Sequence, residues 1–248
     1  MFKEYFILLL MGHIVGDFYF QSGNMAAKKE KGLRWVMIHC ACYWAVMLII
    51  LMIYGASVKF ANIAALFHLI IDASKFFYLS SSKKRRGKMM QTEDRNIFFA
   101  DQLLHFAALI VVAFWAAQSD IQIMKCEILD TFFDVVGISE NLVVSWMFVL
   151  LVIHKPSNIA IQKLLAVYKP ADEDDVKEIN AGRFIGTLER VIMIIFLSIE
   201  QYSAIGLVLT AKSIARYDKI TREKDFAEYY LLGTLLSTVS AIIISFAL

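Results

Sequence analysis

Long apolar runs alternate with short, strongly charged stretches along most of the 248 residues. Several of these runs are close to the ~20 residues that an α-helix needs to cross the hydrocarbon core of a bilayer. The pattern therefore predicts an all-α, polytopic transmembrane bundle of about eight spans, with either a tight hairpin or one broken helix around Glu200. The expected spans are residues 5–21, 35–54, 58–79, 97–117, 141–155, 184–200, 202–216 and 228–247.

Composition supports the membrane class. Hydrophobic residues make up 59% of the chain and charged residues 19%, whereas about a quarter of a soluble domain is charged. Two of the three cysteines, Cys40 and Cys42, lie inside an expected span, which excludes the disulfide framework of a small secreted protein. The sequence contains neither a P-loop nor a glycine-rich dinucleotide fingerprint. We therefore expect the lipid bilayer as a partner and no nucleic acid.

Basic residues are concentrated in alternate connections between the expected spans. Loops rich in Lys and Arg stay in the cytoplasm, so we expect both chain termini outside and four basic loops inside. The intervening connections contain almost no basic residues. The four basic loops follow the first, third, fifth and seventh spans and carry Lys28, Lys29, Lys31 and Arg34; Lys83, Lys84, Arg85, Arg86, Lys88 and Arg95; Lys155, Lys163, Lys169, Lys177 and Arg183; and Arg216, Lys219, Arg222 and Lys224.

Two segments between the spans are not expected to cross the membrane. Residues 121–136 have the spacing of an amphipathic helix lying on the outer surface, and the acidic residues 172–175 are typical of a solvated loop. The expected organisation is a four-span domain at 1–118, an interfacial segment at 119–140 and a second four-span domain at 141–248. The apolar face of the interfacial helix would carry Ile121, Met124, Ile128, Phe132 and Val135.

Seven ionisable side chains lie inside the first four expected spans, where each costs roughly 2.5–3.5 kcal/mol on insertion scales. Six of them form three pairs four residues apart, and four residues advance a helix by about 400°, so both members of a pair face the same way. At ~1.5 Å per residue, all seven lie roughly 6–17 Å from the cytoplasmic face, which favours one clustered site. They are His13 with Asp17, His68 with Asp72, Asp101 with His105, and His39 without a pair.

Imidazole and carboxylate groups are ligands of zinc, and manganese or iron uses the same donors. Seven groups are enough for one zinc ion with orienting partners, or for two ions with a bridging aspartate. Cys40, next to His39, is a further candidate ligand, although a free cysteine in a span is more often simply buried. A metal-free proton-conducting cluster and a polar cluster that only holds the helices together are the alternatives.

The stretch from His13 to Gln21 reads H-x-x-G-D-F-x-x-Q, which resembles the signature of a domain-of-unknown-function family of bacterial inner-membrane proteins. His39, residues 68–75 and residues 101–105 are similar to later motifs of that family. The resemblance covers about residues 5–115 and implies a multi-pass protein of the bacterial cytoplasmic (inner) membrane. The family has no assigned reaction. The layout is more distantly similar to metal-dependent inner-membrane hydrolases, which is a likeness of arrangement only.

Charged residues recur near the cytoplasmic ends of the later spans, in stretches that resemble the C-terminal region of some family members. Cations outnumber carboxylates there, so one interpretation is a pocket for an anionic group such as a phosphate or a lipid headgroup. The alternative is ordinary ion pairing combined with anchoring at the cytoplasmic face. The candidate anion-binding residues are Arg183, Glu189, Arg190 and Lys212, with Gln21 and Gln102 beside the first cluster.

The cluster in the first four spans favours a metal-dependent hydrolase that opens to the cytoplasmic leaflet. The four histidines would be ligands, and the three aspartates would be further ligands, a bridge or the general base. Lys75, at the inner end of the third span, would neutralise negative charge on an anionic or lipid-linked substrate. A divalent-metal transporter is the alternative, because histidine–aspartate pairs on neighbouring spans also form transport sites. A structural or signalling membrane protein is the third possibility.

Overall fold

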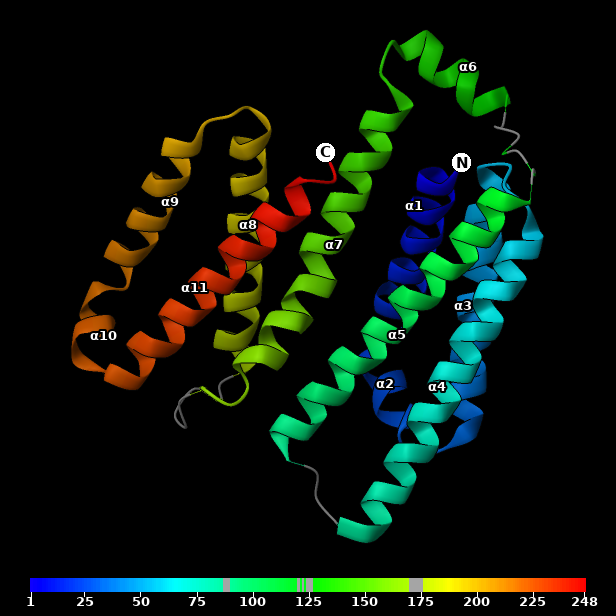
Figure 1. The fold of residues 1–248 in the computed structure, drawn as a ribbon. Coiled ribbons are helices and arrows are strands. Elements are labelled where there is room, and N and C mark those ends of the chain that lie inside the picture. Colours follow the sequence, from blue (N-terminus) through cyan, green and yellow to red (C-terminus); the bar gives the residue numbers. More distant parts are fainter. Residues whose placement is uncertain (87–89, 120, 122, 124–126, 170–175) are drawn as a thin grey trace. The chain divides into compact units, whose positions relative to one another are not determined.

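The computed structural model describes residues 1–86, 90–119, 121, 123, 127–169 and 176–248, and within them every regular element is a helix (Figure 1). The acidic residues 172–175 and Met124 of the expected interfacial helix lie outside the described residues. The elements are α1 (Phe2–His13), the π-helix η1 (Ile14–Tyr19), α2 (Gly23–Lys29), α3 (Leu33–Ile53), α4 (Val58–Arg86), α5 (Gln91–Gln118), α6 (Glu127–Val136), α7 (Glu140–Leu165), α8 (Val176–Ser198), α9 (Tyr202–Ala215), α10 (Tyr217–Arg222) and α11 (Lys224–Ser245).

Among the described residues, five helices are long and apolar enough to cross a membrane. They are α3, the Val58–Ser82 part of α4, α5, α7 and α11, and α9 is a shorter apolar helix. The chain is thus a multi-pass helical membrane protein, as the sequence predicts. The expected first span is divided between α1 and η1, and the expected sixth span falls within α8. The number of eight spans and the orientation stay predictions.

The turn between α8 and α9 settles one open question about the expected spans. The chain leaves α8 after Ser198 and enters α9 at Tyr202, so these are two separate helices rather than one broken helix. Between them Glu200 has φ of 59°, a left-handed conformation that reverses the chain tightly. The Gln201 N–H closes the turn by donating to the Phe196 carbonyl at 2.8 Å.

The expected fifth span, 141–155, stops just before Pro156, but α7 continues through this proline to Leu165. A proline inside a helix removes the N–H that would bond to the carbonyl four residues earlier. Here that carbonyl, on Val152, accepts a hydrogen bond from the Ser157 hydroxyl at 2.8 Å. Neighbouring side chains thereby satisfy the freed backbone group, which is how proline is tolerated in membrane helices.

Part of the expected interfacial helix is confirmed as α6, over Glu127–Val136, whereas Ile121 and Ile123 are not helical. The Tyr5 hydroxyl donates to the Ile121 carbonyl at 3.2 Å, and Ile121 and Ile123 pack against the apolar core of the first unit. Along α6 itself, Phe132 and Val135 are exposed.

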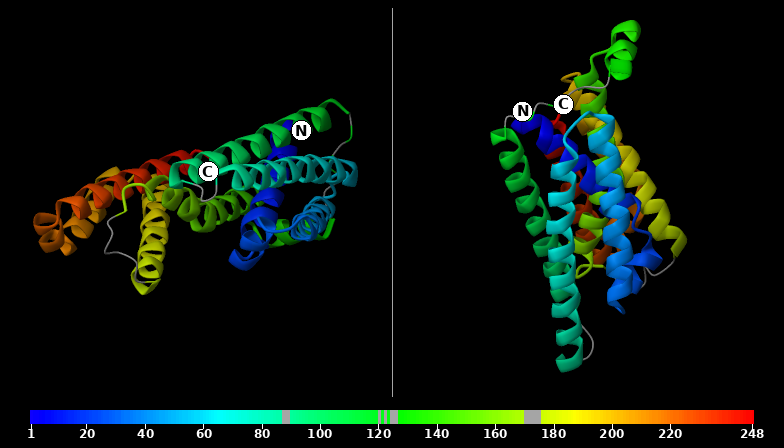
Figure 2. Two further views of the ribbon diagram at one scale, coloured as in Figure 1. Left: turned by 90° about the horizontal axis from the view of Figure 1, so that it is seen from below. Right: turned by 90° about the vertical axis from the view of Figure 1, so that its right-hand side faces the viewer.

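The chain divides into two compact units, Met1–Glu140 and Asn141–Leu248. In the first unit α1 packs on α3 and α5, and α4 packs on both α3 and α5; the long helices α4 and α5 run side by side in both views of Figure 2. A fully buried apolar cluster fills the end of this bundle at which α1 begins and α3 ends. It includes Tyr5, Leu9, Met47, Leu51, Phe60, Val112 and Ala116.

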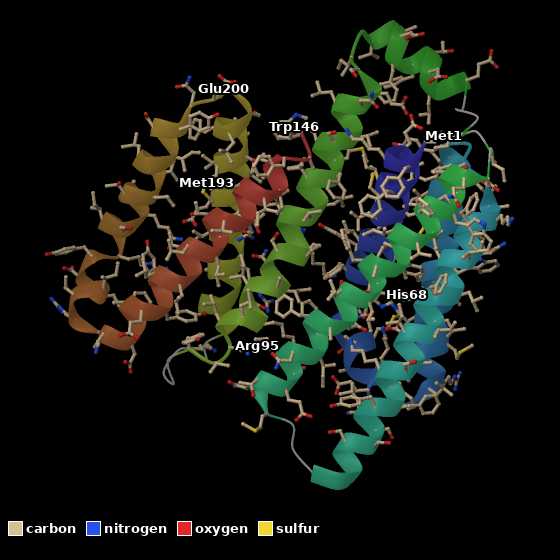
Figure 3. All side chains as sticks on the ribbon, viewed as in Figure 1. Met1, His68, Arg95, Trp146, Met193 and Glu200 are labelled. Atoms are coloured by element: carbon tan, nitrogen blue, oxygen red, sulfur yellow. The ribbon has the colours of Figure 1, made fainter. Side chains whose placement is uncertain are left out.

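The second unit contains α7, α8, α9, α10 and α11. Its buried apolar cluster consists of Val149, Ile153, Met193, Ile194 and Ala241, with Trp146 packed against it (Figure 3). Helices α8 and α11 make the most extensive contact of this unit.

Candidate metal centre

All seven ionisable residues of the expected cluster lie together inside the first unit. Five helical segments carry them, and six of the seven are buried, with Asp17 nearly so. His68, on the middle part of α4 (Figure 3), is 1% exposed and lies against His39, Asp72 and His105. The segments contribute His13 from α1, Asp17 from η1, His39 from α3, His68 and Asp72 from α4, and Asp101 and His105 from α5.

A π-helix, η1, separates the first expected pair. The Phe20 N–H donates to the Val15 carbonyl at 3.0 Å, which is the five-residue hydrogen bond of a π-turn. A π-turn takes more residues than an α-turn, so His13 and Asp17 contact different partners. Asp17 Oδ1 lies 3.1 Å from His39 Nε2, whereas His13 Nε2 lies 3.5 Å from Gln102 Oε1. The two residues border the same site from different sides.

Glycine allows η1 to lie directly on α3. A Cβ atom placed on Gly16 would be 2.8 Å from Tyr43 Cδ2, and one on Gly12 would be 2.6 Å from Met47 Sδ. The Tyr43 ring in turn stacks on the His68 imidazole, with a centroid distance of 3.7 Å and an interplanar angle of 3°. Close packing at Gly16 therefore helps to fix the orientation of His68.

We expect Gly16→Ala to lower the free energy of unfolding by about 1–3 kcal/mol, the usual cost of forcing extra volume into a packed interior. The added methyl group must displace Tyr43, so His68 loses the ring against which it stacks. Thermal unfolding in detergent measures the loss. Gly23→Ala is the matched control, because a Cβ at Gly23 meets nothing within 4 Å. Equal melting temperatures for the two variants would contradict the role given to Gly16.

The tightest group in the cluster consists of Asp17, His39 and His68. His39 Nε2 lies 3.1 Å from Asp17 Oδ1 and 3.1 Å from His68 Nε2. Zinc bonds of about 2.0–2.1 Å in tetrahedral geometry place neighbouring ligand atoms about 3.3 Å apart. Two of the three distances are thus close to those expected around a single ion, and all three ligand atoms lie within 4.8 Å of one another.

Asp72 connects this group to a second one. Its Oδ2 lies 3.6 Å from His39 Nε2 and 3.5 Å from His68 Nε2, and its Oδ1 lies 3.9 Å from His105 Nε2. Asp101 Oδ1 is 3.8 Å from the same His105 nitrogen. Asp72 therefore presents one oxygen to each group, which is the arrangement of a bridging carboxylate.

Several buried atoms of the cluster have no hydrogen-bond partner among the described residues, including Asp101 Oδ1 and His105 Nε2. A buried polar atom left unsatisfied costs about 1–3 kcal/mol, so such atoms call for an explanation. A cation between the carboxylate oxygen and the imidazole nitrogen would satisfy both. The donor set thus fits a divalent metal, and four groups of three residues have ligand atoms within 4.8 Å of one another.

Cys40 belongs to one of these groups, together with His68 and Asp72. Its thiol is buried, and Sγ lies 3.9 Å from Asp72 Oδ2. The sequence interpretation gave Cys40 less weight than ordinary burial. The structure places it where a thiolate could reach a bound ion.

Two lysines reach the cluster. Lys75, an expected site residue, donates to Asp101 Oδ2 at 2.8 Å. Lys29 donates to Asp72 Oδ2 at 2.6 Å and to Gln21 Oε1 at 3.0 Å. Sequence reasoning treated Lys29 only as a member of a basic cytoplasmic loop. No local signal identifies its role, because the contact depends on how the chain folds back through α2.

Gln102 completes the border of the site. Its amide nitrogen lies 3.1 Å from Asp17 Oδ2 and 3.4 Å from Asp101 Oδ2, and its oxygen faces His13. It therefore orients one carboxylate from each side of the cluster. Gln21 accepts a hydrogen bond from Lys29, which also binds Asp72.

The candidate anion-binding residues of the second unit are only partly brought together. Lys212 donates to Glu189 Oε2 at 2.7 Å. Arg190, which follows Glu189 in the sequence, is buried. Arg183 instead donates to Gln162 Oε1 at an exposed position. Arg183 therefore has a separate partner, and only Glu189, Arg190 and Lys212 remain as candidate anion-binding residues of this unit.

Comparison with known proteins identifies one family. Residues 5–130 match the family model described as "Protein of unknown function (DUF3307)", and this stretch contains all seven ionisable residues of the cluster. No curated protein and no solved structure matches the chain. The expected membership of a family of unknown function is confirmed, while the motif and the likeness to hydrolases stay predictions. The chain belongs to the DUF3307 family.

Proposed function

We propose that this protein is a metal-dependent, zinc-type hydrolase of the bacterial cytoplasmic membrane, with its site in the cytoplasmic half of the bilayer. The observation that carries the proposal is the buried group of Asp17, His39 and His68, whose ligand atoms are 3.1 Å apart at two of its edges. Manganese or iron would fit the same donors. The cytoplasmic placement of the site depends on both termini lying outside, as the positive-inside rule predicts.

In this proposal Asp17, His39 and His68 would hold the metal. Bound there, zinc would supply a water with a pKa lowered toward about 7 and would polarise the bond to be cleaved. Asp72 lies next to the two histidine nitrogens and is held by the Lys29 ammonium group. It is therefore placed to accept a proton as general base.

The remaining members of the cluster form the second group. His13, Asp101 and His105 would orient the residues around a single ion, or would hold a second ion; with two ions Asp72 would be the bridge instead of the general base. The longer distances here, 3.8 and 3.9 Å from His105 Nε2, favour the Asp17 group as the stronger of the two.

Access to the site favours an enzyme over a transporter. The buried apolar cluster of Leu9, Met47, Leu51 and Val112 fills one end of the first unit and offers an ion no polar path among these residues. Toward the opposite end, the Lys75 side chain is 30% exposed beside Asp101. A site open on one side suits a substrate that enters and leaves by the same route.

Charge suggests the class of substrate. The three carboxylates of the cluster outnumber the ammonium groups of Lys29 and Lys75 by one, and a divalent ion would reverse the sign of the balance. An anionic substrate, such as a phosphate ester linked to a lipid, would then be attracted to the site. Lys75 would stabilise negative charge that develops in the reaction.

The test begins with metal content. The protein is purified in detergent without chelator, and zinc, manganese and iron are measured by mass spectrometry; we expect roughly one or two equivalents of one metal. Less than about half an equivalent would reject both the hydrolase and the transporter. Vesicles with a zinc-sensitive dye inside then separate these two. Zinc uptake that is lost in Asp72→Asn would support transport and overturn the hydrolase.

A further inference from the structure

The second unit buries an arginine whose hydrogen bonds to the described residues all go to neutral acceptors. Arg190 is 2% exposed. It donates from Nε to the Ile153 carbonyl at 3.3 Å, from Nη1 to Ser237 Oγ at 3.2 Å and from Nη2 to Asn158 Oδ1 at 2.7 Å. All these acceptors are neutral. A charge buried in a membrane protein is costly unless negative charge nearby balances it, so the carboxylates around Arg190 matter.

The nearest acidic residue along the chain, Glu189, interacts electrostatically with Arg190, but it is shared with a second cation. Glu189 is buried, and its carboxylate accepts a hydrogen bond from Lys212 at 2.7 Å. Together the two cations exceed this single carboxylate by one positive charge. The Lys212 ammonium group has three donors; it contacts Glu189 and the face of the Tyr230 ring, whose centroid lies 5.2 Å away.

Helix α11 adds two hydroxyl groups to this region. Tyr230 Oη and Thr234 Oγ1 are buried atoms without a hydrogen-bond partner among the described residues. They lie one turn apart, and Ser237, which binds Arg190, follows on the same face of the helix. This face is directed at α8, since α8 and α11 pack against each other.

We propose that Arg190, Lys212, Tyr230 and Thr234 bind a phosphate group. Guanidinium and ammonium groups only donate hydrogen bonds, and both hydroxyls have donors to offer, whereas phosphate oxygens accept. Charge-assisted hydrogen bonds of this kind are the strong ones, and arginine suits phosphate geometry. One negative charge, as on a phospholipid phosphodiester, would balance the excess. The ligand is either a phospholipid headgroup or free phosphate, and the proposal is independent of the metal site in the first unit.

The experiment uses the full-length protein in neutral detergent with two probes. Radiolabelled inorganic phosphate is tested by equilibrium dialysis, and phosphatidylglycerol in mixed micelles is tested by native mass spectrometry. We expect retention of at least one probe, and Tyr230→Phe and Thr234→Val should each weaken it about three- to tenfold, the effect of losing a hydrogen bond. Retention of phosphate alone identifies a free anion, and retention of phosphatidylglycerol alone identifies a headgroup.

Both substitutions remove hydroxyls that have no protein partner, so the fold should tolerate them, and thermal unfolding checks this. Thr210→Val is the control, because its exposed hydroxyl donates only to its own helix, at the Gly206 carbonyl. The proposal is overturned if neither probe is retained, or if the Tyr230 and Thr234 variants retain as much as the parent. Either result would leave Arg190 as a purely structural link between helices.

Discussion

Replacing His68 by alanine is expected to remove the bound metal, lowering the affinity at least about 100-fold, since even the loss of a partner behind a ligand costs 10–100-fold. His68 belongs to three of the four groups that could hold an ion, more than any other residue. Its Nε2 lies 3.1 Å from His39 Nε2 and 3.5 Å from Asp72 Oδ2. One substitution therefore removes a ligand from both halves of the cluster.

Metal content and chelator resistance after purification measure this effect. The control is His154→Ala, which changes the remaining histidine of the chain, on α7 in the second unit, and should leave the metal in place. Native metal content in His68→Ala would place the ion elsewhere. The metal content of Asp101→Asn then distinguishes one bound ion from two, because Asp101 belongs only to the group with Asp72 and His105. Loss of half the metal indicates two ions.

The parts of this site that could be predicted from the sequence are those that depend on regular helices. His68 with Asp72 and Asp101 with His105 lie four residues apart on uninterrupted stretches of α4 and α5, so each pair faces the same way. The cost of ionisable groups in hydrocarbon is what indicates that these pairs meet. The residue number of each pair within its span was enough to predict that the pairs lie at the same depth in the membrane.

The parts that could not be predicted depend on irregular backbone and on contacts distant in sequence. Nothing in the stretch around Asp17 signals a π-helix, which places this residue beside His39 rather than above His13. Lys29 reaches Asp72 only because α2 packs back on α3. In α7, Pro156 is normally a sign that a helix ends, and the compensating Ser157 bond is visible only in three dimensions.

The same limit applies to Arg190 on α8, whose partners lie on two other helices. Its position near the middle of an apolar helix is visible in the sequence, but its partners are a backbone carbonyl and Asn158 on α7 and Ser237 on α11. Side chains so far apart in the chain are joined only by the packing of the unit. Sequence reasoning therefore grouped Arg190 with Arg183, which the structure separates from it.

Arg190→Ala is expected to lower the free energy of unfolding of the second unit by about 3 kcal/mol or more. The substitution leaves acceptors on Ile153, Asn158 and Ser237 without their donor, and each buried unsatisfied group costs about 1–3 kcal/mol. Arg183→Ala is the matched control, because Arg183 bonds to Gln162 at an exposed position, where the expected effect is within about 0.5 kcal/mol.

Hydrogen–deuterium exchange in detergent locates the loss as well as measuring it. Amides of α7, α8 and α11 should exchange faster in Arg190→Ala, while those of α3, α4 and α5 keep their protection, because the two groups of helices belong to separate compact units. Metal content should stay at the parental level for the same reason. Loss of protection throughout the chain would mean that the units unfold together. Unchanged exchange in α7, α8 and α11 would mean that these three bonds do not hold the helices together.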